Sequence, residues 1–156
     1  LVARPPKHRT IVVTHCYLNV DGERIRKTDK FGPSTYVRVN NDGEETWTKF
    51  VSRHPNVFLV LNGHMLARPG VRLSSKGEKG NVVHQVLSNY QGLRNGGDGW
   101  LRLMKFVPGK NRIEVSTWSP TLKKFWEEKN QKSRDDHRFT LEYDMTPTAG
   151  ERGAAR

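Results

Sequence analysis

The sequence predicts an α/β fold that begins as a strand–helix–strand (βαβ) unit and continues as mostly antiparallel strands. In the first part, aliphatic runs at residues 8–15 and 57–62 lie on either side of an amphipathic stretch at residues 44–54. That order is typical of a βαβ unit, whose strands are expected to be parallel with a right-handed crossover. After residue 100, stretches that alternate apolar and polar residues are separated by Pro-Gly and Ser-Pro turns, which is the pattern of antiparallel hairpins.

The first predicted strand covers residues 8–15 and is almost continuously aliphatic. Such a run favours a strand that is buried on both faces, as in a parallel or mixed sheet covered by helices. A polar connection follows over residues 17–45, with Gly, Asn and Asp turn signals rather than core residues. A connection this long inside a domain is usually functional. Because it leaves directly from His15, we expect it to form one wall of a cleft.

The predicted helix at residues 44–54 places Trp47, Phe50 and Val51 on one face, because residues three and four positions apart are neighbours on a helix. Its acidic residues come first and its basic residues last, which matches the helix dipole. A proline ends the helix, and His54 is assigned to the helix terminus rather than to any chemistry.

The remaining predicted elements are short and have clear turn boundaries. They are strands at residues 71–74 and 82–90 joined by a hairpin tip at 76–81, a flexible loop at 93–99, strands at 100–106, 112–118 and 139–143, and a charged loop or short helix at 123–137. Residues 1–145 are interpreted as part of one domain, and residues 146–156 as a disordered tail.

A histidine follows each of the two aliphatic strands. His15 ends the first strand, and His64 comes just after the second, in the sequence Asn62-Gly63-His64. Gly63 is expected to adopt a positive φ and so to make the sharp turn that presents His64. Because ligands of α/β sheets bind at the carboxyl ends of strands, the two imidazoles predict a metal or phosphate site. The alternative is that each histidine is a hydrogen-bonded rim residue.

The chain has 156 residues and one cysteine, Cys16. An intramolecular disulfide and a cysteine-based zinc cluster are therefore excluded, and we expect Cys16 to act as a small buried hydrophobe. The formal net charge of +11 favours polyanionic partners. However, the basic residues are scattered and no nucleic-acid motif is present. A basic, solvated surface is favoured, and a non-catalytic module that binds a polyanion such as nucleic acid is the alternative.

No apolar run approaches the roughly twenty residues that a membrane span needs, so no span is expected. The chain starts at Leu1 rather than at Met, which predicts that it is a piece of a longer precursor. A secretory signal upstream therefore stays open, and the sequence assigns no localisation.

A series of sequence blocks runs in order from about residue 8 to residue 143. The blocks are Thr14-His15-Cys16-Tyr17-Leu18, Phe58-Leu59-Val60-Leu61-Asn62-Gly63-His64, Gly80-Asn81-Val82-Val83-His84-Gln85-Val86-Leu87-Ser88-Asn89-Tyr90-Gln91, Gly97-Asp98-Gly99-Trp100-Leu101-Arg102-Leu103 and Ser116-Thr117-Trp118-Ser119-Pro120. In this order they resemble the carboxy-terminal half of a calcineurin-like metallophosphoesterase. A strand that ends in Gly-His is common by itself, and the ordered series is what makes the resemblance specific.

The resemblance implies a four-layer α/β/β/α sandwich with a dinuclear centre of Mn, Fe or Zn at the strand ends. It implies hydrolysis of phosphomonoesters or phosphodiesters by a metal-bound hydroxide. His15 and His64 match the positions of two histidines that ligate the same ion in that family. Asn62 and Gly63 match the turn that presents the second of these histidines.

The chain departs from the family pattern in its ligand set. Leu66 stands where the family has the second histidine of its Gly-His-x-His motif, and His84 is either a replacement ligand or a structural strand residue. The amino-terminal motifs Asp-x-His, Gly-Asp-x-x-Asp and Gly-Asn-His, which supply the carboxylates, are absent. We therefore expect a fragment with weak metal binding and little turnover alone. A homodimer that covers the surface left by the missing half stays open.

Overall fold

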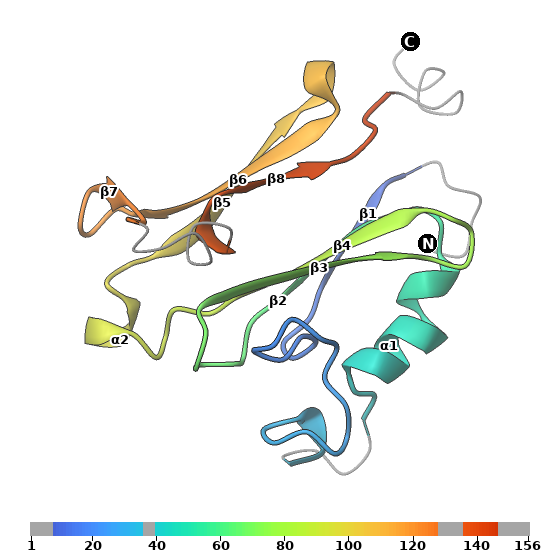
Figure 1. The fold of residues 1–156 in the computed structure, drawn as a ribbon, viewed down its shortest axis with the longest axis horizontal. Helices are drawn as coiled ribbons and strands as arrows, with labels where there is room; N and C mark the ends of the chain where they lie inside the picture. Colours follow the sequence, from blue (N-terminus) through green and yellow to red (C-terminus); the bar gives the residue numbers. More distant parts are fainter. Residues whose placement is uncertain (1–7, 36–39, 128–135, 147–156) are drawn as a thin grey trace. The chain divides into compact units, whose positions relative to one another are not determined.

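Two β-sheets and a few short helices form a mixed α/β structure in the computed structural model, which describes residues 8–35, 40–127 and 136–146 (Figure 1). The chain divides into two compact units, Leu1–Asn89 and Tyr90–Arg156, each built around one sheet. Within the described residues, no helix has the length and apolar character needed to cross a membrane. The predicted disordered tail lies, apart from Thr146, outside the described residues.

The first sheet has the strand order β1-β2-β4-β3. Its strands are β1 (Thr10–Val13), β2 (Val57–Asn62), β3 (Gly70–Lys76) and β4 (Val82–Ser88). β1 and β4 both pair with β2 in parallel, and β3 pairs with β4 as an antiparallel hairpin. The predicted parallel βαβ unit is therefore confirmed, and the predicted strand at 71–74 is longer at both ends.

The prediction that the first strand is buried on both faces is wrong. β1 is an edge strand, and its residues alternate in exposure. Val12 packs against the core, whereas Ile11 is 42% exposed and Val13 76% exposed. An aliphatic run is also expected in an edge strand, because β-branched residues favour any extended backbone. The run of residues alone therefore did not distinguish the edge of the sheet from its centre.

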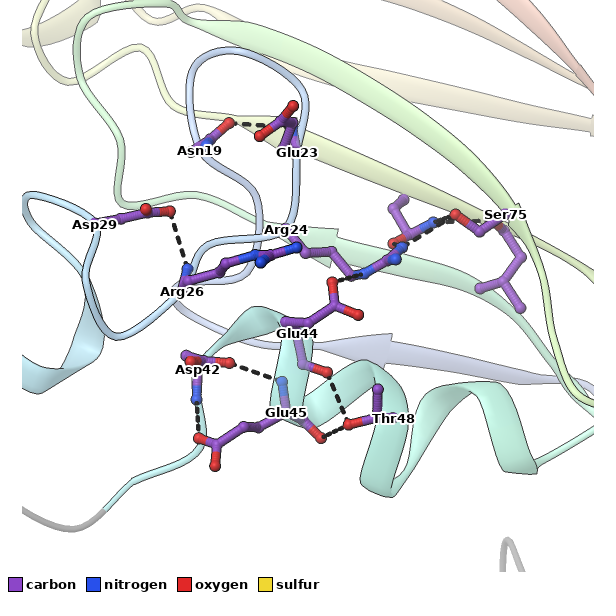
Figure 2. A network of polar contacts seen from close by, with 12 residues as sticks. Asn19, Glu23, Arg24, Arg26, Asp29, Asp42, Glu44, Glu45, Thr48 and Ser75 are labelled. Atoms are coloured by element: carbon purple, nitrogen blue, oxygen red, sulfur yellow. Dashed lines mark hydrogen bonds and ion pairs between the residues drawn. The ribbon is translucent and has the colours of Figure 1, made fainter.

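Helix α1 (Gly43–Lys49) begins with a capping box that links Asp42 and Glu45 (Figure 2). The Asp42 carboxylate accepts the backbone N–H of Glu45 at 2.7 Å, and the Glu45 carboxylate accepts that of Asp42 at 3.2 Å. Hydrogen bonds first from Lys49 and then from Lys27 lower the pKa of Glu45 to about 2. The two hydrogen bonds between Asp42 and Glu45 fix the start of the helix to the residue that precedes it.

The helix is shorter than predicted. It breaks at Phe50, and a 3₁₀ turn, η2 (Val51–Arg53), completes the segment before Pro55. The residue before a proline avoids helical backbone angles, and His54 is accordingly extended. Nδ1 of the His54 ring lies 2.7 Å from the Phe50 carbonyl oxygen. This contact agrees with the assignment of His54 to the helix terminus.

The core of the first unit lies between α1 and the sheet (Figure 1). It includes residues from the connection that was predicted to be polar, because Tyr17, Leu18 and Ile25 are fully buried in it. Cys16 and Trp47 of α1, each 8% exposed, belong to the same core. A short isolated bridge between residues 18 and 24 folds this part of the chain back on itself. Apolar residues spaced irregularly between turns carry no period, so the sequence pattern did not reveal them.

Tyr17 also carries a polar group into this core. Its hydroxyl is buried and has no hydrogen-bond partner among the described residues. Burial raises the pKa of Tyr17, and the nearby Arg24 guanidinium opposes that rise. The phenol is therefore neutral at physiological pH and packs as an aromatic core residue.

The second unit is an antiparallel sheet around β6, as the alternating pattern predicted. Its elements are α2 (Arg94–Gly97), β5 (Leu101–Val107), η3 (Pro108–Lys110), β6 (Arg112–Ser119), β7 (Lys124–Phe125) and β8 (Phe139–Glu142). The predicted loop at 93–99 contains the short irregular helix α2, and the predicted charged loop contains β7. Residues 128–135 of that loop lie outside the described residues.

A buried polar network supports this second sheet. Arg102 donates through Nε to the Tyr90 hydroxyl at 3.2 Å and through Nη1 to the Asp136 carbonyl at 2.8 Å. Burial lowers the pKa of Arg102. The His137 ring stacks on Trp126 with ring centroids 4.0 Å apart and planes at 15°. These contacts hold the segments that flank the sheet against it.

Gly43 provides a test of how the connection packs on α1. A Cβ at this position would collide with the Tyr17 carbonyl oxygen and would lie 3.0 Å from the Ile25 backbone nitrogen. We expect Gly43→Ala to lower the free energy of unfolding by about 2 kcal/mol, the cost typical of overpacking. Urea denaturation measures it.

The matched control is Thr48→Ala in the same helix, because Thr48 is exposed. Its effect is expected to stay within about 0.5 kcal/mol. Equal stabilities of the two variants would contradict the close packing of the connection on the start of α1.

Candidate metal centre

The pairing of β1 with β2 places His15 and His64 at the same edge of the first sheet. The ladder continues past both strands, because Thr14 donates to the Leu61 carbonyl at 3.0 Å and Gly63 donates to the His15 carbonyl at 3.1 Å. The strands are parallel, so this edge is the one at their carboxyl ends. The two predicted site residues are therefore brought together by backbone hydrogen bonds.

The two imidazole rings approach each other through one nitrogen atom of each ring. His64 Nδ1 lies 2.9 Å from His15 Nε2, and the rings meet edge to face with centroids 4.7 Å apart. Two nitrogens that each lie about 2.1 Å from one cation are about 3 Å apart if their bonds meet at right angles, and about 3.4 Å apart at the tetrahedral angle of zinc. The separation of 2.9 Å is that of a hydrogen bond between the two rings, and it is also close to the spacing of two ligands at right angles on one ion.

The turn that presents His64 differs from its prediction. Gly63 has no positive φ; His64 itself does, at 66°. Met65 donates its backbone N–H to the Gly63 carbonyl at 2.8 Å, which closes a three-residue turn centred on His64. The amide of Gly63 still continues the ladder to His15, so the chain reverses one residue later than expected. A non-glycine residue with positive φ is strained, and such strain is concentrated at functional sites.

Asn62 links three segments beneath the site. Its side chain is buried; Oδ1 accepts the Leu18 N–H at 3.1 Å, and Nδ2 donates to the Val86 carbonyl at 3.1 Å. The amide therefore joins the segment that follows His15 to the neighbouring strand β4. This arrangement gives Asn62 a structural role directly under the histidine pair.

The connection after β1 reaches the site through Phe31. His64 Nε2 lies 3.0 Å from the Phe31 carbonyl oxygen. Phe31 also has a positive φ, 64°, although it is not glycine. Sequence reasoning expected the connection to form a wall but did not identify this contact. The Phe-Gly-Pro turn signal at residues 31–33 marked the position, but a backbone carbonyl has no sequence signature.

Other candidate ligands lie elsewhere. His84 is buried in β4, where its Nδ1 lies 2.8 Å from the Ser74 hydroxyl, and it pairs with Leu59 of β2. Leu59 precedes Gly63 by four residues, about 13 Å along a strand, so His84 is too far back to share an ion with His64. Leu66 is 53% exposed. Among residues 8–35, 40–127 and 136–146, no group of three or more His, Cys, Asp or Glu side chains could hold a metal ion.

Comparison with known proteins finds a relative whose name states no activity. The chain is similar to "Uncharacterized protein YvnB" of Bacillus subtilis (strain 168), with 29% identity over 153 residues. The match covers 94% of this chain and 11% of the relative, so the chain spans about a tenth of the length of the curated relative that it matches. No family model matches the chain. No solved structure matches it either.

Because His64 has a positive φ, we expect glycine to be tolerated better than alanine at this position, the reverse of the usual order. Glycine adopts a positive φ without cost, whereas alanine does not. We therefore expect His64→Gly to be more stable than His64→Ala by about 1 kcal/mol, measured by urea denaturation.

Leu66 supplies the matched pair, because it is exposed and has no positive φ. There we expect Leu66→Ala to be at least as stable as Leu66→Gly. The same order at both positions would show that His64 is not held in a left-handed conformation.

Proposed function

We propose that this chain is the carboxy-terminal portion of a metal-dependent phosphoesterase that hydrolyses phosphomonoesters or phosphodiesters. In this proposal, His15 and His64 hold one divalent cation. The observation that carries it is the 2.9 Å approach of His64 Nδ1 to His15 Nε2 at the carboxyl edge of two parallel strands. That edge is where α/β sheets bind their ligands.

The residue types support Mn, Fe or Zn as the ion. Imidazole nitrogen is a preferred ligand of zinc and iron, and carboxylates suit manganese. Bound divalent ions supply Lewis-acid stabilisation of the charge on a phosphoryl group. The protein's own part is to fix the two imidazoles: backbone bonds between the strands set their positions, and the strained turn directs the second ring toward the first.

Two histidines do not complete such a centre, so the proposal includes ligands from outside this chain. A dinuclear site in this class of enzyme also needs carboxylates, and we propose that these come from other parts of a longer polypeptide. The match to a small part of a much longer relative supports this reading. The proposed arrangement of the complete protein is a four-layer α/β/β/α sandwich, to which the two sheets of this chain contribute strands.

Calorimetric titration of the chain with Zn²⁺ and with Mn²⁺ tests the assignment of His15 and His64 as ligands. We expect one weak site per chain, because two imidazoles supply only part of a coordination shell. His15→Ala and His64→Ala should each abolish it. His54→Ala is the matched control, since His54 is a histidine that contacts the Phe50 carbonyl, and it should leave binding unchanged.

In a longer protein that contains this chain and shows metal-dependent phosphoesterase activity, His64→Ala should also abolish turnover. Equal metal affinity of wild type and both site variants, or unchanged turnover, would refute the assignment.

A further inference from the structure

We propose that the backbone carbonyl of Phe31 is a positioning group for the metal site. It selects the tautomer of His64 that carries its proton on Nε2 and so directs the Nδ1 lone pair toward the cation beside His15. This inference rests on the proposed function and extends it to the connection between β1 and α1. The contact that carries it is the 3.0 Å approach of His64 Nε2 to the Phe31 carbonyl oxygen.

The hydrogen-bond partner of His64 Nε2 determines which nitrogen of that ring carries the proton. A carbonyl oxygen can only accept a hydrogen bond, so His64 Nε2 must donate and must carry a proton. A neutral imidazole has one ring proton, which leaves Nδ1 as the nitrogen with the lone pair. Metal-ligating histidines usually donate their other ring N–H to a carbonyl or carboxylate in this way. The metal-binding nitrogen of His64 is therefore Nδ1, the atom that faces His15.

The same accounting extends to His15. With the lone pair of His64 Nδ1 directed at it from 2.9 Å, His15 Nε2 is the donor in the metal-free protein. A cation that binds at Nε2 needs the lone pair of that nitrogen, so the single ring proton of a neutral His15 must move from Nε2 to Nδ1 by exchange through water. The pair thus occupies, with a hydrogen bond, the place that a cation would take.

A local turn holds the Phe31 carbonyl in position. Asp29 accepts the backbone N–H of Arg26 through its carboxylate at 2.9 Å (Figure 2), and its own carbonyl accepts the N–H of Gly32 at 3.1 Å. A Cβ on Gly32 would lie 3.1 Å from the carbonyl oxygens of both Arg26 and Asp29, so the turn is closely packed around its glycine. Phe31 thus lies between Asp29 and Gly32, whose backbones are hydrogen-bonded to each other.

Arg24, which precedes this turn in the chain, connects it to the helix and the sheet (Figure 2). Arg24 pairs with Glu44 of α1 at 2.8 Å and donates to Ser75 at 3.0 Å and to Gln85 at 3.2 Å. Its guanidinium also lies 4.5 Å from the ring centre of Trp47. One side chain therefore joins this part of the connection to the helix and to strands β3 and β4.

The Phe31 side chain does not explain its backbone. The ring is 59% exposed, so it adds little to the core. Its φ of 64° is nevertheless strained for a phenylalanine. The two residues that meet in the Phe31–His64 contact are thus both strained, which points from an observed outlier to a role at the site.

Two substitutions at Phe31 separate the carbonyl from the ring. Phe31→Gly removes the ring and keeps a backbone that adopts positive φ, whereas Phe31→Pro removes the ring and forces φ to about −65°, which moves the carbonyl. Asp29→Ala, which loosens the same turn without a proline, is the second test variant. Circular dichroism checks that each variant is folded.

The readout is ¹⁵N NMR of histidine-labelled protein, first without metal and then during Zn²⁺ titration. We expect the Nε2–H tautomer of His64 in wild type and in Phe31→Gly. In Phe31→Pro we expect a mixture of tautomers and a Zn²⁺ affinity that is lower by about 10- to 100-fold, the usual effect of losing such a partner. Asp29→Ala should shift both quantities in the same direction by less.

An Nδ1–H tautomer in the wild type, or the same tautomer and affinity in all variants, would overturn the inference. If the wild type shows the Nε2–H tautomer but no Zn²⁺-dependent shift at either histidine, the metal function is refuted and the metal-directing role of Phe31 with it. The metal-free spectra therefore distinguish failure of the positioning contact from failure of the proposed function.

Discussion

The parallel pairing of β1 with β2 is the constraint on which the candidate site depends. It aligns the carboxyl ends of two strands that are far apart in sequence, and one further backbone bond, from Gly63 to the His15 carbonyl, extends the alignment to both histidines. That bond keeps the backbones of the two histidine-bearing segments paired beyond the ends of the strands. Asn62 reinforces it from below, because its buried amide joins the start of the connection to β4.

Around this pair, the connection between β1 and α1 serves as support. It contributes core residues, a helix cap and an arginine that bonds to two strands and a helix. It then returns to the site through the carbonyl of Phe31. His64 and Phe31, which meet in this contact, both have a positive φ.

The sequence predicted the order of the main strands and the helix because each carries a clear period or an aliphatic run. It also placed His15 and His64 each at the end of such a run, and the parallel pairing of the two strands brings both to one sheet edge. It did not predict that β1 is an edge strand or that Ile25 is buried, because these depend on which neighbours the fold supplies. The helix was predicted to start at residue 44, and the Asp42–Glu45 capping box was not identified from the sequence. The role of the Phe31 carbonyl had no sequence signature at all.

Anomalous diffraction from crystals soaked in Zn²⁺ tests the central claim most directly. The account predicts an anomalous peak about 2.0–2.1 Å from both His15 Nε2 and His64 Nδ1, with His64 Nε2 still within hydrogen-bond distance of the Phe31 carbonyl. Histidine rings that remain 2.9 Å apart without a peak between them, or zinc bound only elsewhere on the chain, would contradict it.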